Sequence, residues 1–145
     1  MHIESPAFES HQTIPQKYTC QGENLSPPLA FRDIPNGSKS LVLIMDDPDA
    51  PSGTFDHWLV WDISPAAAQL AEDVKLPKQG LNGFRKKGYG GPCPPPGKPH
   101  RYFFKLYALD VKINLPEGST KSQVEEAMKG HILGKAELVG VYQRH

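Results

Sequence analysis

Residues 41–51 read LVLIMDDPDAP, a continuous apolar run followed directly by acids and prolines. The apolar part, residues 41–45, has the length of a buried strand and shows no alternation with polar residues. Pro48 and Pro51 have no N–H and a restricted φ, so strand hydrogen bonding cannot continue through them. The sequence therefore predicts a buried strand that ends in a stiff loop carrying three carboxylates.

Other apolar runs alternate with turn-rich stretches along the rest of the chain. Runs rich in aromatic and β-branched residues have the composition of strands. The strand candidates are residues 57–63, 101–109 and 136–142, with weaker signals at 3–8 and 29–31. No strand–helix–strand rhythm occurs, so the residues favour an antiparallel sheet or sandwich with a minor helical component.

One helix is predicted towards the end of the sequence. Ser119 or Thr120 is a suitable N-cap, and Gln123 completes a capping box with Thr120. The apolar residues at helical spacing are Val124, Ala127, Met128 and Ile132, with Gly130 and Gly134 as stop signals. We expect this stripe to pack on the core, and residues 66–71 to add a short helical turn.

Length and charge narrow the classes of function. A chain of 145 residues has the size of one domain, and we expect a single domain over residues 1–145. Lys and Arg total 16 and Asp and Glu total 16, which argues against a nucleic-acid partner. No apolar run approaches the ~18 residues of a membrane span, and residues 1–10 lack the features of a signal peptide. We therefore expect a cytoplasmic protein without membrane insertion.

The two cysteines, Cys20 and Cys93, are too few for a disulfide framework and form no C-x-x-C motif. Two free thiols in a reducing cytosol are the default expectation. One bridge between two distant loops is the alternative, and we predict that the two residues lie close together. A Cα separation above about 7 Å would exclude that bridge.

Residues 88–102, GYGGPCPPPGKPHRY, hold four of the 13 glycines and five of the 15 prolines. Glycine lets the backbone approach a ligand closely, and proline reduces the entropy that a loop loses on ordering. We therefore expect a preorganised wall that leads into the strand at 101–109. Because side chains alternate along a strand, His100 and Tyr102 are predicted to share one face, while Arg101 points the other way.

Ionisable side chains gather at the predicted strand ends. Asp47 follows the first strand, a short turn leads back to His57, and His100 and Tyr102 begin the aromatic strand. Imidazole and phenol groups donate hydrogen bonds, and Asp47 could orient a histidine from behind, so this set is suited to a phosphate or carboxylate ligand. The alternative is structural: Asp47 and Asp49 cap a tight turn, and the histidines are satisfied framework side chains.

Catalytic and metal-binding sites are further alternatives. Paired acids and histidines serve in general acid–base catalysis. Asp47, His57 and His100 are residue types that bind zinc. Cys93 lies near His100 in the sequence, so a cysteine nucleophile is a further alternative. The G-x-S-x-G, H-E-x-x-H and phosphate-loop patterns are absent. We therefore expect a protein that is not an enzyme and binds no metal or other cofactor.

Four segments together resemble the phosphatidylethanolamine-binding protein family, also called the Raf kinase inhibitor protein family, and its bacterial and archaeal branch in particular. They are YTCQGENLSPPL at 18–29, DDPDAPSG at 46–53, DHW at 56–58 and GYGGPCPPPGKPHRYFFKLYALD at 88–110. The resemblance implies a mostly β fold, in which a large antiparallel sheet packs on a smaller sheet with one or two peripheral helices. It also implies a pocket for phosphate-like head groups and small anions.

The resemblance carries a set of ligand-binding residues onto the two loops. They are Asp47, Asp49, Pro51, His57, Gly90, His100 and Tyr102. The resulting hypothesis is a non-enzymatic protein that binds a small phosphorylated or carboxylate ligand and regulates a partner kinase or other protein, as a monomer or homodimer. The alternative is an inhibitor of a protease or kinase that acts through its surface, or an acid–base or metal-dependent hydrolase that uses the same pocket.

Overall fold

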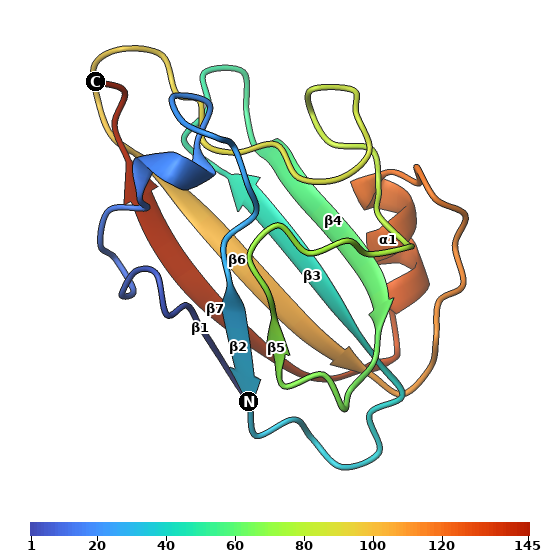
Figure 1. Cartoon of the computed structure of the whole chain (residues 1–145). Helices are drawn as coiled ribbons and strands as arrows, with labels where there is room; N and C mark the ends of the chain where they lie inside the picture. The colour runs from blue at the N-terminus through green and yellow to red at the C-terminus, as the bar shows by residue number, and fades with distance from the viewer.

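Two antiparallel β-sheets and one α-helix make up the computed structural model, which describes residues 1–145 (Figure 1). The larger sheet has the order β4-β3-β6-β7, and the smaller sheet has the order β1-β2-β5. The elements are β1 (His2–Glu4), η1 (Gln16–Tyr18), β2 (Leu29–Arg32), β3 (Ser40–Asp47), β4 (Phe55–Ile63), β5 (Gln69–Leu70), β6 (His100–Leu109), α1 (Lys121–Met128) and β7 (Ile132–Tyr142). This architecture confirms the expected large sheet packed on a smaller one.

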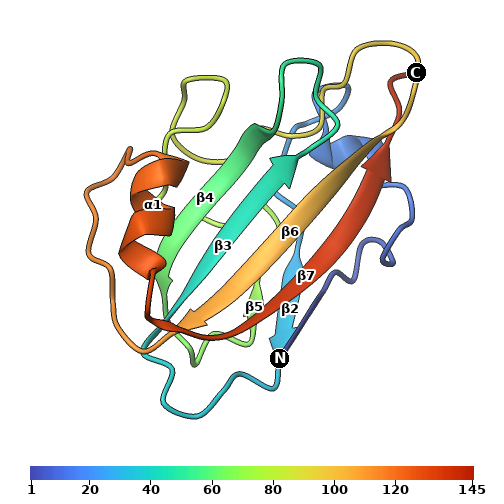
Figure 2. The same cartoon turned by 180° about the vertical axis from the view of Figure 1, so that it is seen from behind.

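The elements form three layers. The smaller sheet covers one face of the larger sheet, and α1 lies on the other face beside β4 (Figure 2). Leu41, Leu43 and Met45 belong to the main core, whereas Val42 and Ile44 belong to a second apolar cluster with residues of α1. All eight residues of β3 are buried, because both of its faces are covered. The continuous apolar run of this strand follows from that double burial.

Strand β6 pairs with β3 on one side and β7 on the other, and its burial alternates. His100, Tyr102 and Phe104 are buried, whereas Arg101 is exposed. The predicted division of His100 and Tyr102 from Arg101 is therefore confirmed. The alternation arises because only part of the outer face of the larger sheet lies beneath α1.

Helix α1 begins where the sequence predicts. Thr120 is the N-cap, its hydroxyl accepts a hydrogen bond from the Gln123 N–H, and the Gln123 side chain accepts one from the Thr120 N–H. These two bonds form the predicted capping box. Val124 and Met128 are the buried residues of the helix.

Two predicted helical features are wrong. Ile132 does not belong to the apolar helical stripe: the helix ends at Met128, Gly130 takes a φ of 79°, and Ile132 begins β7 with 46% of its surface exposed. The predicted helical turn at 66–71 is instead a turn followed by the short strand β5, which pairs with β2. In both cases pairing with a neighbouring strand outweighs the local spacing of apolar residues.

The expectation of two free thiols is also wrong. Cys20 and Cys93 form a disulfide with a Cα–Cα distance of 5.4 Å, which confirms that the two residues lie close together. The backbone N–H of Cys20 also donates a hydrogen bond to the carbonyl of Pro92. The bridge ties the segment after η1 to the proline-rich loop before β6, two loops that are 73 residues apart in sequence. Separately, none of the helices has both the length and the hydropathy needed to cross a membrane.

Candidate functional site

The antiparallel arrangement of the larger sheet brings the two predicted loops together. Strand β3 ends at Asp47 and β6 begins at His100, and these neighbouring strands run in opposite directions. Asp47 also pairs with Phe55 at the start of β4. Figure 1 shows the loop after β3 and the loop that leads into β6 at the end of the molecule that holds the C-terminus, opposite the N-terminus.

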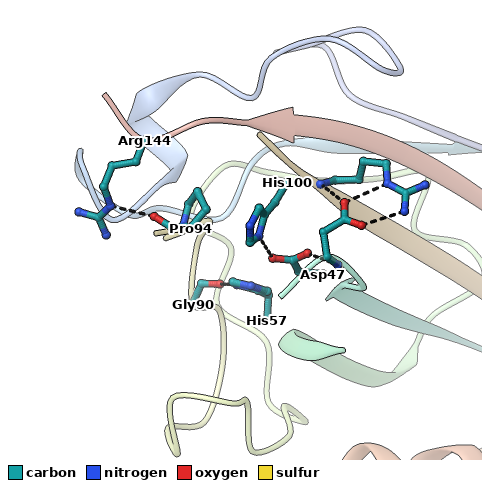
Figure 3. A network of polar contacts seen from close by, with 8 residues as sticks. Asp47, His57, Gly90, Pro94, His100 and Arg144 are labelled. Carbon is teal, nitrogen blue, oxygen red and sulfur yellow. Dashed lines mark hydrogen bonds and ion pairs between the residues drawn. The ribbon is translucent and has the colours of Figure 1, made fainter. Parts of the chain in front are cut away.

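A cavity of about 200 Å³ opens among these strand ends. Its polar lining consists of Asp47, His57, His100 and Tyr102, and each of the four is buried in the protein framework. Figure 3 shows Asp47, His57 and His100 gathered at one place, although they come from three different strands. Pro51 lies on the same lining. The structure thus brings together five of the seven residues that the sequence predicts as ligand-binding.

His57 is held by the loop that precedes β6. Its Nδ1 lies 2.6 Å from the carbonyl oxygen of Gly90 (Figure 3). A carbonyl only accepts, so Nδ1 carries the hydrogen and donates, which leaves Nε2 for other partners. Burial lowers the pKa of His57 below its usual value of 6.5, so the ring is neutral at pH 7. In the neutral ring Nε2 carries a lone pair.

His100 is oriented by Asp47. The distance between His100 Nδ1 and the Asp47 carboxylate is 2.7 Å, and both side chains are buried. The second carboxylate oxygen of Asp47 accepts a hydrogen bond of 2.7 Å from the backbone N–H of Asp49. The carboxylate is therefore occupied on both oxygens, and it fixes which nitrogen of His100 donates to it.

Tyr102 supplies a fully buried hydroxyl that lacks a hydrogen-bond partner. The residue is 0% exposed, and its hydroxyl makes no hydrogen bond. Burial, with the nearby Asp47 carboxylate, raises the pKa of Tyr102 far above its usual value of 10.0, so the hydroxyl keeps its proton. A buried hydroxyl without a partner is costly, which makes it available to a ligand that accepts a hydrogen bond.

The rest of the lining is apolar. It is formed by Ala50, Pro51, Phe55, Phe84, Pro94 and Pro95, together with the bridged Cys93. The ring of Phe84 packs edge-on against Phe55, with 4.8 Å between ring centroids, and its centroid lies 5.6 Å from that of His57. A ligand would therefore place its polar group among the histidines and its substituent against aromatic and proline rings.

The other two predicted ligand-binding residues, Asp49 and Gly90, do not line the cavity. The Asp49 carboxylate accepts hydrogen bonds of 2.9 Å from the backbone N–H, Nε and Nη2 of Arg101, which lower its pKa to about 2. Gly90 faces Phe84 on its open side, where an added Cβ would lie 2.4 Å from that ring. Asp49 holds the loop after β3 to the start of β6, and Gly90 holds His57.

Some residues of the site are not predicted from the sequence. Phe55 and Phe84 line the cavity, and Arg144 contacts the loop before β6 through a hydrogen bond of 2.8 Å from its Nε to the carbonyl of Pro94. Phe84 lies in a turn between glycines, GFRKKG, where no periodicity exists to indicate which way it points. The nearest signal in the sequence is an isolated aromatic residue in a polar loop, which alone does not place it in a site.

The geometry bears on the two alternative chemistries. The structure holds no cluster of three or more His, Cys, Asp or Glu side chains arranged to bind a metal ion, so the alternative zinc site of Asp47, His57 and His100 is not formed. Cys93 is bonded to Cys20 and presents no thiol for a cysteine nucleophile in this state.

Comparison with known families agrees with this architecture. Residues 4–143 match the family model described as phosphatidylethanolamine-binding protein. The chain belongs to the phosphatidylethanolamine-binding protein family. Among its relatives in this family, a UPF0098 protein of Aquifex aeolicus is 49% identical over 99% of this chain and 89% of its own length. A UPF0098 protein of Methanothermobacter thermautotrophicus is 49% identical over 99% of both chains.

Solved structures of the family superpose closely on the chain. A homologue from Chlamydia trachomatis has a TM-score of 0.95 and 47% identity, and the match covers 99% of this chain and 97% of that one. An Escherichia coli protein described as a new member of the mammalian family has a TM-score of 0.92 and 32% identity, over 99% and 98% of the two chains. The phosphatidylethanolamine-binding protein fold is thus shown for the whole chain.

Proposed function

We propose that the cavity binds a small anion, a phosphate group or a carboxylate, and that the protein acts as a binding protein and not as an enzyme. The observation that carries this proposal is the unpartnered hydroxyl of Tyr102, buried beside two imidazoles. An oxyanion would accept its hydrogen bond and remove the cost of leaving it unpaired.

The two histidines would contribute through their Nε2 atoms, since both rings use Nδ1 within the protein. His57 is neutral when the cavity is empty, so its Nε2 donates only after the ring has gained a proton, unless the anion itself brings one. Binding of a fully deprotonated anion is therefore coupled to proton uptake at His57. An imidazolium in a cavity with apolar walls would attract the anion more strongly than the same charge in water.

The size and the walls of the cavity limit the ligand. A volume of about 200 Å³ is below the 300–1,000 Å³ of typical sites for drug-sized molecules, so only a head group would be enclosed. The apolar side chains around the polar floor are suited to the organic part of a phosphate ester. A phosphorylated small molecule or head group therefore fits better than a large rigid ligand.

The lining argues against catalysis. It contains no serine, no threonine and no free cysteine to act as a nucleophile. The Asp47 carboxylate is already bonded on both oxygens, to His100 and to the backbone of Asp49. A general base must lie within hydrogen-bond reach of the proton that it removes, whereas the Asp47 carboxylate is directed at His100 and the Asp49 N–H.

The test is a titration of the oxidised protein with inorganic phosphate and with phosphoethanolamine, in which the NMR signals of the histidine rings are monitored. We expect shifts of His57 and His100 at millimolar ligand, and no shift of His131. His131 is the matched control, because it also forms a histidine–carboxylate pair, with Asp110 at 2.8 Å, outside the cavity.

Variants sharpen this test. His100→Gln should weaken phosphate binding, whereas His131→Gln should not. Unchanged affinity in the His100 variant, or no shift of either cavity histidine, would overturn the proposal. Release of phosphate from phosphoethanolamine during the titration would instead favour a hydrolase.

The site of action in the cell is a separate expectation. The sequence predicts a cytoplasmic protein, whereas disulfides such as Cys20–Cys93 persist more readily in oxidising compartments. Fractionation of the source cells with antibodies to the protein would decide between the two.

A further inference from the structure

The disulfide forms part of the wall of the cavity. Cys93 lies on the cavity lining beside Pro94 and Pro95, and it is partly buried. Its partner Cys20 is exposed to solvent and does not line the cavity. The two cysteines therefore differ in exposure, and we expect a thiol in solution to attack Cys20.

The guanidinium of Arg144 lies beside both sulfurs of this disulfide. Its Nη2 lies 3.0 Å from the sulfur of Cys93 and 3.6 Å from that of Cys20. Its Nε donates to the carbonyl of Pro94, as Figure 3 shows, so the guanidinium is fixed against the wall. Arg144 forms no ion pair with a carboxylate. Its positive charge can therefore stabilise a negative charge on either sulfur.

We propose that the Cys20–Cys93 disulfide is a thiol-exchange site, and that its opening by a low-molecular-weight thiol weakens anion binding in the cavity. This inference rests on the proposed function, because it concerns the same cavity. It combines three observations: the difference in exposure between Cys20 and Cys93, the position of Cys93 on the lining, and the guanidinium of Arg144 beside both sulfurs.

The exchange proceeds in two steps. A thiolate of the external thiol attacks the sulfur of Cys20, a new S–S bond forms, and the Cys20–Cys93 bond breaks with its electron pair on Cys93. The Cys93 thiolate is stabilised by Arg144. A second external thiolate attacks the external sulfur of the mixed disulfide and releases Cys20 as a thiolate. In total two external thiols are oxidised to one disulfide, and the protein disulfide is reduced to two thiols.

The consequence for the cavity is electrostatic. In the bridged state the sulfurs are neutral and the charge of Arg144 is uncompensated. After reduction a Cys93 thiolate would stand on the wall of an anion site and would neutralise that cation, so the potential felt by a bound anion becomes less favourable. By linkage, a bound anion makes the bridge harder to reduce: a tenfold difference in affinity corresponds to about 30 mV in reduction potential.

The first experiment follows the exchange itself and needs no ligand. The oxidised protein is treated with glutathione, quenched with iodoacetamide and analysed by mass spectrometry of its peptides. We expect glutathione on Cys20 and alkylation on Cys93. Glutathione found mainly on Cys93 would overturn the proposed direction of attack.

The role of the guanidinium is tested in the same assay. Arg144→Gln should slow reduction by glutathione at least about threefold, because the leaving thiolate loses its cation. The matched control is Arg32→Gln, which removes an exposed arginine that pairs with Glu4 in the smaller sheet and should leave the rate unchanged. Equal rates in the Arg144 variant and the native protein would contradict the assignment of Arg144.

The second experiment compares phosphate affinity by calorimetry in the oxidised protein, the reduced protein and two single variants. We expect the affinity to fall about threefold to tenfold on reduction. Cys20→Ser and Cys93→Ser both lack the bridge, but only Cys20→Ser keeps a sulfur on the cavity wall. Weaker binding in Cys20→Ser than in Cys93→Ser supports the electrostatic coupling, and equal affinity in the two variants overturns it.

The two experiments also separate this inference from the proposed function. If the oxidised protein binds no phosphate, the proposed function fails, and the coupling fails with it. If the oxidised and reduced proteins bind phosphate equally well, the proposed function stands and the coupling alone is overturned.

Discussion

At the scale of single residues, Tyr102 separates the requirements of binding from those of folding. Its hydroxyl is buried without a partner, so Tyr102→Phe removes an unsatisfied group from the protein and a donor from the cavity. We expect phosphate affinity to fall about tenfold, as for a hydrogen bond to a charged group. The free energy of unfolding should stay the same or rise by up to ~1 kcal/mol. Calorimetry and urea unfolding measure the two effects.

Tyr18 provides the matched control for this prediction. Its hydroxyl donates a hydrogen bond of 2.7 Å to Glu72, and neither residue lines the cavity. Tyr18→Phe should therefore lower the free energy of unfolding by about 1 kcal/mol and leave phosphate affinity unchanged. A loss of stability in the Tyr102 variant as large as that in the Tyr18 variant would show that the Tyr102 hydroxyl has a partner within the protein.

His57 sets the pH dependence of binding. Burial lowers its pKa, so this residue is neutral in the empty site above pH 6.5, and binding of a fully ionised ligand requires His57 to take up a proton from solvent. Sulfate is the suitable probe, because it does not titrate near neutral pH. Its affinity should fall as pH rises from 6 to 8, by at most about tenfold per pH unit for one proton.

His57→Gln should reduce this slope, since a glutamine amide donates a hydrogen bond at any pH. Calorimetry in two buffers of different ionisation enthalpy gives the number of protons taken up directly. Sulfate affinity that does not change with pH would contradict the protonation of His57 on binding.

At the scale of elements, the ion pair of Asp49 with Arg101 joins the loop after β3 to the start of β6. The pKa of Asp49 is about 2 in the folded protein, against an ordinary value of 3.8, so the unfolded chain binds more protons between these values. The stabilisation is complete above about pH 4 and is lost as pH falls towards 2. In the Asp49→Asn variant, stability should therefore fall less between about pH 4 and about pH 2 than in the native protein, measured by thermal unfolding at each pH.

The start of α1 allows a prediction that is independent of the cavity. The hydroxyl of Thr120 accepts the hydrogen bond of the Gln123 N–H in the capping box. Thr120→Ala should cost about 1 kcal/mol of stability, measured by urea unfolding, and should not change phosphate affinity. A change of affinity in this variant would show that the helix and the cavity are coupled.

The elements differ in how well the sequence predicts them, for physical reasons. The burial of 41–45 and the alternation of β6 are local patterns, and both are predicted correctly. Ile132 fits the helical spacing only by continuing it past Gly130, and its true partner Leu109 lies in a distant part of the sequence. Local spacing does not indicate that pairing.

The same reasoning applies to the site. Asp47, His57, His100 and Tyr102 are predicted from their positions at strand ends, and the antiparallel sheet brings them to one cavity. Asp49 has the right residue type and location, but its carboxylate is taken by Arg101. Such competition between neighbours becomes visible only in three dimensions.

At the scale of the whole molecule, the Cys20–Cys93 bridge closes a loop whose ends are 73 residues apart, and this closed segment contains β2, β3, β4 and β5. Closing a loop of this length stabilises the folded state by about 4 kcal/mol when the entropy of the unfolded chain is considered alone. The double variant Cys20→Ser with Cys93→Ser should therefore unfold at clearly lower urea concentration. Equal unfolding midpoints of the variant and the oxidised protein would contradict a bridge in solution.

The last residues of the chain affect how the protein should be handled in such measurements. The Gln143 side chain bonds to the carbonyl of Gly97, Arg144 braces Pro94, and the N–H and carbonyl of His145 both bond to the side chain of Gln21. A purification tag or fluorophore fused after His145 would therefore press on the wall of the anion site and on the disulfide. The N-terminus lies at the opposite end of the molecule, so fusions belong there (Figure 1).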